Sequence, residues 1–389
     1  SAVLLGTVAF ASQFPIFLLA PIGGLIADRH NRHRIVIGTQ AASMILASLL
    51  AWLTLAGRIQ VWHIFVLSSL LGVVNAFDIP ARQSFIVQMV GKQDLMNAIA
   101  LNSSMFNGAR IVGPAIAGIL VASIGEGWCF FGNAVSYIAV IAGLLMMHVP
   151  PRRTAGTSES PLAHLMEGFR YARHTRPIRS LLLLLGLVSI VGMPFAVLMP
   201  IFADRILHGG ARGLGILMGA TGVGALIGAL TLATKKGVKG LPVWVLRASC
   251  GFGVTLILFA ASRNFLLSVV LLVPVGASMI TQMAVSNTLI QSMVPDQLRG
   301  RVMSLHSMMF MGMAPFGAFF AGVVAHKIGA PWTVALGGIG CLIGAAVFGS
   351  QLTVLRAETR ELILAQQMAG GTPAQAVALT PATDDDRAD

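Results

Sequence analysis

Charged and polar side chains are scarce in this chain, so the few that interrupt its apolar runs are the first candidates for function. Asp28, Arg29 and Arg32 lie within one short turn, in the stretch GGLIADRHNRHR at residues 23–34, and Arg110 lies about twelve residues into another apolar run. Carboxylates and guanidinium groups in such places form ion pairs or bind polar ligands. The sequence shows no HExxH, GxSxG, P-loop or clustered His/Cys pattern, which speaks against an enzyme and against a metal or cofactor.

The elements that must position these side chains are long apolar segments. Hydrophobic residues make up 56% of the 389 residues and charged residues only 10%. A soluble helical bundle would need polar faces to meet water, whereas about 20 apolar residues suffice for a helix to cross a bilayer. The sequence therefore predicts an all-α polytopic membrane protein. We expect eleven spans, at about 4–26, 35–57, 62–81, 98–124, 128–149, 179–203, 211–233, 241–262, 265–288, 302–325 and 331–353.

Polar stretches divide the chain into four parts. An N-terminal helical half (1–149) is followed by a linker (150–178) whose second part predicts a basic amphipathic helix at a membrane surface. A C-terminal helical half (179–353) is followed by a tail (354–389), which starts with a short helix and ends in a disordered segment.

The positive charges predict the orientation in the membrane. If the turn at 23–34 is cytoplasmic, 20 of the 26 Lys and Arg residues are cytoplasmic and five lie on the other side, while Arg110 lies within a span. We expect a protein of the bacterial cytoplasmic (inner) membrane, with its N-terminus on the outer side and its C-terminus in the cytoplasm. This bias accounts for the net charge of +12 without a nucleic-acid partner.

An internal repeat relates the two halves. Residues 103–125 and 307–329 match without a gap at nine of 23 positions, at an offset of 204. Parallel repeats of this kind build one large class of transporters. At the same offset the span at 179–203 would pair with a helix before Ser1, so we expect two six-helix halves in which the first helix is missing from this chain.

The charged turn resembles the signature G-x-x-x-D-R-x-G-R-[RK] of the major facilitator superfamily. Gly24, Asp28, Arg29 and Arg32 occupy matching positions. Asn31 replaces a family Gly, and since Asn tolerates a left-handed turn we expect the tight loop to persist. The stretches VNAFDIPARQSFI, NGARIVGPAIAG, EGFRYARHTRPIR and VPDQLRGRVMS resemble the transmembrane secretion effectors, the exporter branch that includes the enterobactin exporter.

The resemblance implies that the charged turn is part of a gate. Asp28 would pair with groups on the other half, latch the cytoplasmic side while the transporter faces outward, and part from them as the halves rock. Gly24 is expected to let its helix approach a neighbour closely. The alternative is that these charges only anchor the topology, although an acid has the wrong sign for that. Candidate gate partners are Asp78, Arg82, Arg299 and Arg301.

Polar residues at membrane depth predict a transport path. Because an unpaired charge there costs several kcal/mol or more, Arg110 belongs either to a buried structural pair or to a path for substrate or protons. In a neighbouring motif, Gly113, Pro114 and Gly118 predict a bent, closely packed helix, which in the family accompanies export. Simple helix packing explains the two glycines equally well. Candidate path residues are Asn102, Asn107, Arg110, Gln282, Asn287 and His306.

Together these features predict a secondary active transporter that works as a monomer in the lipid bilayer. The leading hypothesis is proton-coupled export of a small amphipathic or siderophore-like molecule by alternating access. Uptake or lipid flipping by the same fold is one alternative, and a membrane sensor that does not transport is another. Proton coupling rests mainly on the resemblance, because few titratable groups lie near the path.

Overall fold

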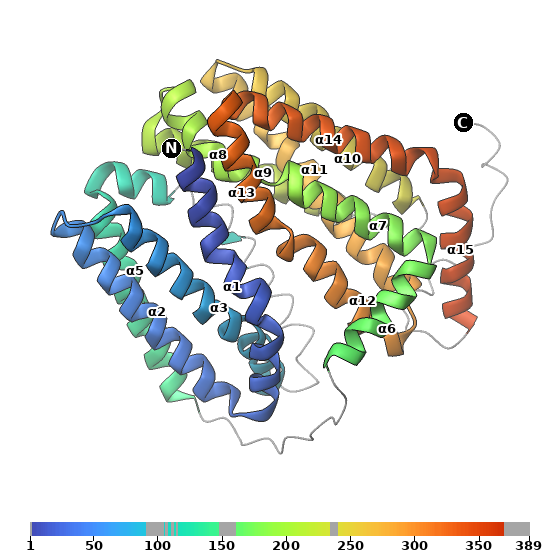
Figure 1. The fold of residues 1–389 in the computed structure, drawn as a ribbon, viewed down its shortest axis with the longest axis horizontal. Helices are drawn as coiled ribbons and strands as arrows, with labels where there is room; N and C mark the ends of the chain where they lie inside the picture. The colour runs from blue at the N-terminus through green and yellow to red at the C-terminus, as the bar shows by residue number, and fades with distance from the viewer. Residues whose placement is uncertain are drawn as a thin grey trace.

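In the computed structural model, residues 2–90, 105, 108–109, 113, 116–147, 161–233 and 240–368 are described. These residues form helices and short turns, with no strand among them. The N-terminal half is the blue-to-teal group in Figure 1. Its helices are α1 (Ala2–Arg29), α2 (Arg32–Leu55), α3 (Val61–Val90), a helical segment at 116–124, and α5 (Glu126–Met146).

The C-terminal half is the green-to-red group in Figure 1. Three of its segments, labelled η, are π-helical turns inside longer helices, a feature that the sequence analysis did not anticipate. Its elements are α7 (Arg176–Leu187), η1 (Val188–Gly192), α8 (Phe195–Ile201), η2 (Phe202–Ile206), α9 (Gly210–Ala233), α10 (Leu241–Ala261), α11 (Phe265–Met293), α12 (Asp296–Ser307), η3 (Met308–Gly312), α13 (Ala314–Ile328) and α14 (Ala330–Ser350).

Two amphipathic helices lie outside the spans. Within the expected linker is α6 (Pro161–His174), and α7 then begins at Arg176, three residues before the expected start of the half. After the last span comes α15 (Leu352–Met368), which packs on α7, α10 and α11.

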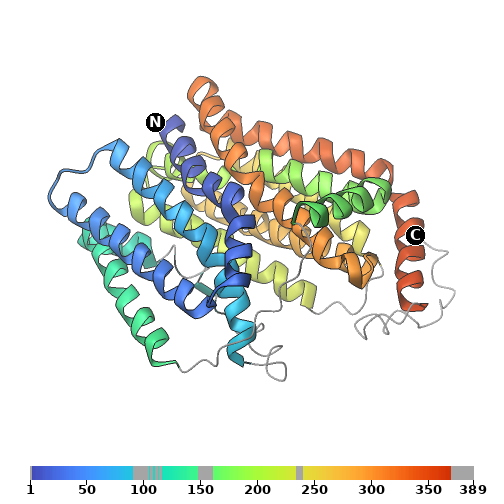
Figure 2. The same cartoon turned by 60° about the horizontal axis from the view of Figure 1, so that its bottom comes forward.

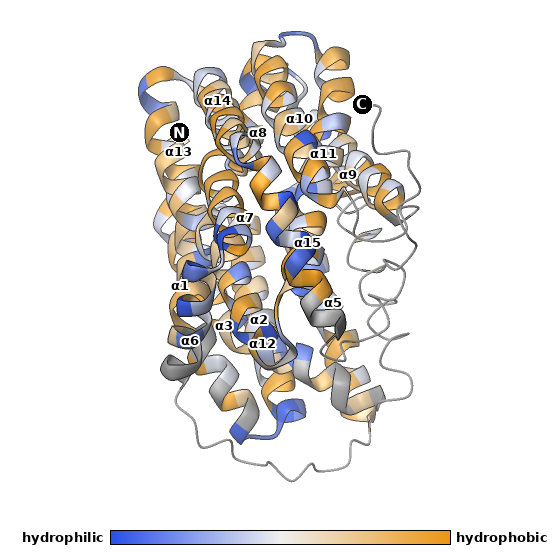
Figure 3. Cartoon of the chain, turned by 90° about the vertical axis from the view of Figure 1, so that its right-hand side faces the viewer, coloured by the Kyte–Doolittle hydropathy of each residue, from blue (hydrophilic) through white to orange (hydrophobic). Residues whose placement is uncertain are grey.

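Ten helical segments of the described residues are long and apolar enough to cross a membrane. They correspond to ten of the eleven expected spans; the eleventh, 98–124, lies largely outside the described residues. Figure 3 shows apolar residues along the helices and hydrophilic ones near many of their ends. Large apolar side chains such as Leu145 and Trp332 are well exposed, as expected of surfaces that face lipid.

Successive spans run in opposite directions, which gives the bundle two ends. The Ala2 end is where α1 begins, and the Arg29 end is where α1 stops. His33 at the start of α2 bonds to the Leu144 carbonyl near the end of α5, so both lie at the Arg29 end. The turns at the Ala2 end include Gly125 and Gly329, which are 204 residues apart and have φ values of 83° and 87°. A side chain at either glycine would be strained.

The two halves repeat one packing scheme. In the N-terminal half α3 packs against α1 and α2, and α2 packs against α5. In the C-terminal half α11 packs against α9 and α10, and α10 packs against α14. Glycine permits the close helix contacts in both: a Cβ would collide with the Ala76 carbonyl at Gly23 and with the Ala277 carbonyl at Gly228.

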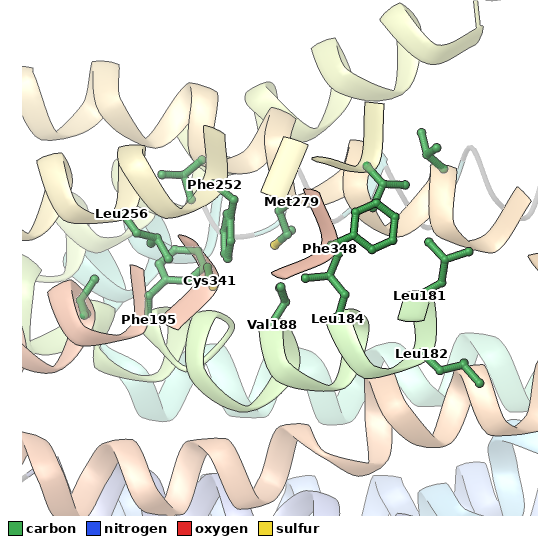
Figure 4. Close-up of a cluster of buried hydrophobic side chains, with 14 of the residues drawn as sticks. Leu181, Leu182, Leu184, Val188, Phe195, Phe252, Leu256, Met279, Cys341 and Phe348 are labelled. Carbon is green, nitrogen blue, oxygen red and sulfur yellow. The ribbon is translucent and has the colours of Figure 1, made fainter. Parts of the chain in front are cut away.

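The larger of the two buried apolar clusters lies in the C-terminal half. Figure 4 shows Leu184 and Val188 facing Met279, with Phe252 and Cys341 beside them. Cys341 is a buried free thiol that packs as a small hydrophobe, in agreement with its apolar surroundings in the sequence. The C-terminal half is therefore organised around one continuous apolar core.

Candidate functional site

Pairs of glycines join the two halves at the Ala2 end. A Cβ on Gly322 of α13 would lie 3.0 Å from the Cα of Gly6 on α1. A Cβ on Gly118 would lie 2.8 Å from the Cα of Gly215 on α9. Gly118 and Gly322 are repeat mates at the offset of 204, and each packs its backbone on a glycine of the opposite half. These four residues form what we call the glycine seam.

An aromatic cluster continues the contact between α1 and α13. The Phe316 ring lies 5.7 Å from Phe10, 6.2 Å from Phe14 and 5.9 Å from Phe17 in near-perpendicular arrangements. Figure 2 shows α1 running beside α13 from the N-terminus. Such pairs contribute about 0.5–1.5 kcal/mol each beyond burial. These rings were not among the predicted functional residues, although the spacing of 10, 14 and 17 places them on one helix face.

Contacts between the described elements of the two halves are concentrated toward the Ala2 end. Among the described elements, the substantial contacts between halves are those of α1 with α8, η3 and α13, together with the contact of Gly118 with α9. The helix α12 packs instead on α6, α7 and α11. Among the described elements, the substantial contacts between the halves therefore lie toward the Ala2 end, away from the charged turn.

The charged turn leads into α2, whose first turn is capped by a side chain. Asn31 is the N-cap of α2, and its side chain accepts a hydrogen bond from the Arg34 backbone N–H at 3.3 Å. Its φ of −68° differs from our expectation of a left-handed residue. Asn31 can stand where the family has glycine because asparagine is a favoured N-cap residue, and an N-cap residue has an extended backbone. Nearby, Arg32 Nε donates to the Ala27 carbonyl at 3.1 Å.

The close helix contact lies one residue earlier than we expected. Gly24 has open space where a Cβ would be, whereas Gly23 packs directly on Ala76 of α3. The two glycines are adjacent in the sequence, and only the rotation of α1 against α3 decides which one contacts α3. Asp28 lies in the last turn of α1, next to Arg29, whose side chain is exposed.

Asp78 is the centre of a buried polar network within the N-terminal half. Its carboxylate is 3% exposed and accepts hydrogen bonds from Thr39 Oγ1 at 2.7 Å and Gln40 Nε2 at 3.0 Å. Its second oxygen pairs with Arg82 at 3.1 Å. The two α2 donors were missed from the sequence, where Thr39 and Gln40 appear only as a polar pair inside an apolar run. The candidate gate residues Asp78 and Arg82 thus pair with each other in this conformation.

Arg301 pairs within the other half. Its guanidinium contacts the Glu167 carboxylate of α6, and a Cβ on Gly168 would lie 2.9 Å from the Arg301 carbonyl oxygen. The linker helix is thereby docked on α12. Arg299 lies on the same helix and is partly buried. Glu167 was not among the predicted residues, because the sequence does not reveal on which span the linker helix docks.

The polar residues of α11 and α12 divide into buried and accessible groups. Gln282 and Ser286 lie one turn apart on the buried side of α11, and His306 of α12 is 4% exposed. Gln282 Nε2, Ser286 Oγ and His306 Nε2 have no hydrogen-bond partner among the described residues. The half-buried Asn287 accepts a hydrogen bond from Gln291. Leaving a buried polar group unpaired costs about 1–3 kcal/mol, so these groups gain from any conformation that supplies a partner.

Several predicted residues lie outside the described part of the chain. Asn102, Asn107, Arg110 and Pro114 belong to this set, so their surroundings are not part of the geometry above. Gly113 is described and has open space at its Cβ position. Its repeat mate Gly317 packs on the Ile190 backbone of η1.

The geometry defines a class of protein: a multi-pass helical membrane protein of two equivalent halves that meet at one end. The family model for transmembrane secretion effectors matches residues 1–381. The chain belongs to this family of major facilitator transporters, and it is a transporter rather than an enzyme.

Curated relatives carry transport names. The staphyloferrin A transporter of Staphylococcus aureus is 26% identical over 351 residues, covering 90% of this chain and 87% of the relative. The multidrug efflux pump Tap of Mycolicibacterium fortuitum is 27% identical, covering 85% and 82%. The enterobactin exporter EntS of Escherichia coli is 25% identical, covering 84% and 78%.

Solved structures confirm the fold. The nucleoside transporter NupG superposes with a TM-score of 0.71 at 11% identity, covering 90% of this chain and 91% of that chain. A bacterial homologue of the human lysosomal transporter Spinster, in an inward-facing and occupied conformation, gives a TM-score of 0.61 at 17% identity, covering 96% and 91%.

Proposed function

We propose that this transporter exports a small amphipathic or siderophore-like molecule from the bacterial cytoplasm by alternating access. The observation that carries the proposal is the glycine seam: among the described residues, the substantial contacts between the halves lie toward the Ala2 end and not at the Arg29 end. The excess of Lys and Arg at the Arg29 end supports a cytoplasmic location for that end and for the C-terminus. The conformation would then be inward-facing and ready to receive a cytoplasmic substrate.

The charged groups at the Arg29 end would act as the cytoplasmic latch. In the present conformation Asp78 pairs with Arg82 in one half, and Arg301 pairs with Glu167 on the C-terminal side. When the halves close at this end, Asp28 would meet the start of α12, where Arg299 and Arg301 and the positive helix N-terminus lie. Arg29 and Arg32 would bridge to carbonyl or acidic groups of the same interface.

The substrate would be held by polar groups between the halves. Gln282 and His306 offer buried side chains with hydrogen-bonding atoms that have no partner among the described residues, and Asn287, on the same helix as Gln282, is half-buried. Arg110, with Asn102 and Asn107 upstream, would line one side of the transport path with positive charge and amide groups. The names of the relatives support export of siderophores or drugs. We propose a monomer that uses the proton gradient, with Asp78 and His306 as candidate proton carriers.

A retention assay tests the proposal. The protein would be produced in a bacterial strain stripped of its own exporters, and cell-associated siderophores, macrolides and dyes would be measured with and without a protonophore. Export predicts lower retention that the protonophore abolishes. Unchanged retention of the whole panel, with the protein present in the membrane, would contradict export, and increased accumulation would indicate uptake.

Two matched pairs of variants connect the assay to the site. Asp28→Asn should abolish transport while Asp204→Asn, at an exposed acid of the opposite end, should not. Arg110→Ala should abolish transport while Arg58→Ala, at an exposed turn between α2 and α3, should not. Full activity of Asp28→Asn would show that the latch is not needed for transport. Full activity of Arg110→Ala would show that the charge of Arg110 is not needed in the transport path.

A further inference from the structure

The linker helix α6 is fixed to the C-terminal half by backbone contact. Gly168 lies so close to α12 that a Cβ would come within 3.0 Å of the Arg301 Cβ. Ala172, one turn later on the same face of α6, is buried. One residue, Thr175, separates α6 from α7. The helix α6 must therefore travel with the C-terminal half when the halves rock.

This docking places an acid beside a gate cation. Glu167 on α6 is ion-paired with Arg301 on α12, and the Arg301 side chain is 23% exposed whereas that of Glu167 is 54% exposed. A partly buried guanidinium needs an acidic partner in each conformation, because removing the partner leaves a charge that is only partly solvated. In the present conformation Glu167 is a partner that does not depend on contact between the halves.

We propose that Glu167 is a positioning residue of the transport cycle that holds Arg301 while the cytoplasmic side is open and yields it to the Asp28 turn when that side closes. The inference rests on the proposed latch, to which it adds a second acid. The exchange keeps the Arg301 charge compensated in both conformations. When the latch opens, one ion pair of Arg301 then replaces another.

The exchange has a predicted direction. Glu167→Gln removes the partner of the open conformation only, so the population should shift toward the conformation closed at the Arg29 end. Asp28→Asn removes the partner of the closed conformation, so the population should shift the opposite way. Exposed ion pairs contribute about 0.2–1 kcal/mol, which corresponds to a shift of about one-and-a-half- to five-fold in the ratio of conformations.

Spin-label distance measurements on the full chain in lipid nanodiscs test this inference. Labels would be placed at Gln83 of α3 and Ala357 of α15, two exposed positions on opposite halves. The background would lack native cysteines, with Cys129, Cys250 and Cys341 replaced by alanine or serine and transport checked before labelling. The measured quantity is the ratio of short to long distances between the labels.

Glu167→Gln is expected to increase the ratio of short to long distances about one-and-a-half- to five-fold. Glu167→Asp, which keeps the charge, should restore the original ratio. Glu361→Gln, at an exposed acid of α15, is the matched control and should leave the ratio unchanged. An unchanged ratio in Glu167→Gln, or a shift to longer distances, would overturn the inference. Asp28→Asn reports separately on the proposed latch, so failure of the latch and failure of the exchange give different results.

Discussion

Gly6 of α1 and Gly322 of α13 lie backbone against backbone across the two halves of the transporter. A Cβ on Gly6 would be 2.6 Å from the Ala318 carbonyl oxygen, and one on Gly322 would be 2.8 Å from the Ala2 carbonyl oxygen. The contact has no room for any side chain, so the halves are held at a distance that only glycine permits. The relative positions of the halves at this end depend on these two residues.

Gly322→Leu should push the halves apart at the Ala2 end and disfavour the conformation described above. We expect a lower melting temperature in detergent and transport reduced at least ten-fold at equal expression, because the displaced backbone cannot relax without opening the seam. The control is Gly143→Leu on α5, where nothing lies within 4 Å of the Cβ position. Equal effects of the two variants would show that leucine in a span, not the seam, is responsible.

Thr39→Val should weaken the network around Asp78. The valine retains the shape but removes a hydrogen bond to a charged group, which is worth about 1.5–3 kcal/mol of unfolding free energy. Thermal unfolding of the purified protein would measure the loss. Thr54→Val on the same helix, whose hydroxyl bonds only to the Leu50 carbonyl, is the control and should change stability less. Wild-type stability in Thr39→Val would mean that the hydroxyl adds nothing to the network.

Gln282→Met should separate stability from transport. The amide Nε2 is buried without a partner among the described residues, so an apolar side chain of similar volume should leave stability unchanged or raise it by about 1 kcal/mol. Transport should fall if the amide binds substrate. Thr288→Val, at an exposed position of α11, should affect neither property. Full transport by Gln282→Met would remove this residue from the path.

Ser189→Ala should loosen the contact between two π-helical turns. Ser189 Oγ in η1 donates to the Phe310 carbonyl of η3 at 2.6 Å, which satisfies a backbone acceptor where helical bonding is irregular. We expect a loss of about 1 kcal/mol in unfolding free energy and a changed rate of conformational exchange. Ser48→Ala is the control, since that hydroxyl bonds only within its own helix. An unchanged exchange rate would contradict a role for this contact in the motion.

The architecture could be predicted because it depends on local chemistry. The length of an apolar segment predicts a span. The ungapped repeat aligns structurally equivalent residues: the offset of 204 pairs Gly118 with Gly322, and both pack on glycines of the opposite half. The turn glycines Gly125 and Gly329 follow the same register and share a positive φ. Such features repeat because both halves solve the same packing problem.

What the sequence could not supply depends on how separate helices dock. Gly23 rather than Gly24 touches α3 because of a rotation that no spacing rule specifies. Asn31 serves as an N-cap instead of a left-handed residue, since both roles suit asparagine and only the path of the chain distinguishes them. Glu167 was missed because its partner lies on a helix more than a hundred residues away.

The docking of α6 on α12 also limits the amplitude of the transport cycle. Since α6 is carried by one half and α5 ends at Met146 in the other, with Met147 as its C-cap, the covalent connection between the halves on this side is residues 148–160. A fully extended chain of this length reaches about 45 Å at ~3.3–3.6 Å per residue. This segment is therefore a tether, and its contour length limits how far α5 and α6 can move apart at the Arg29 end.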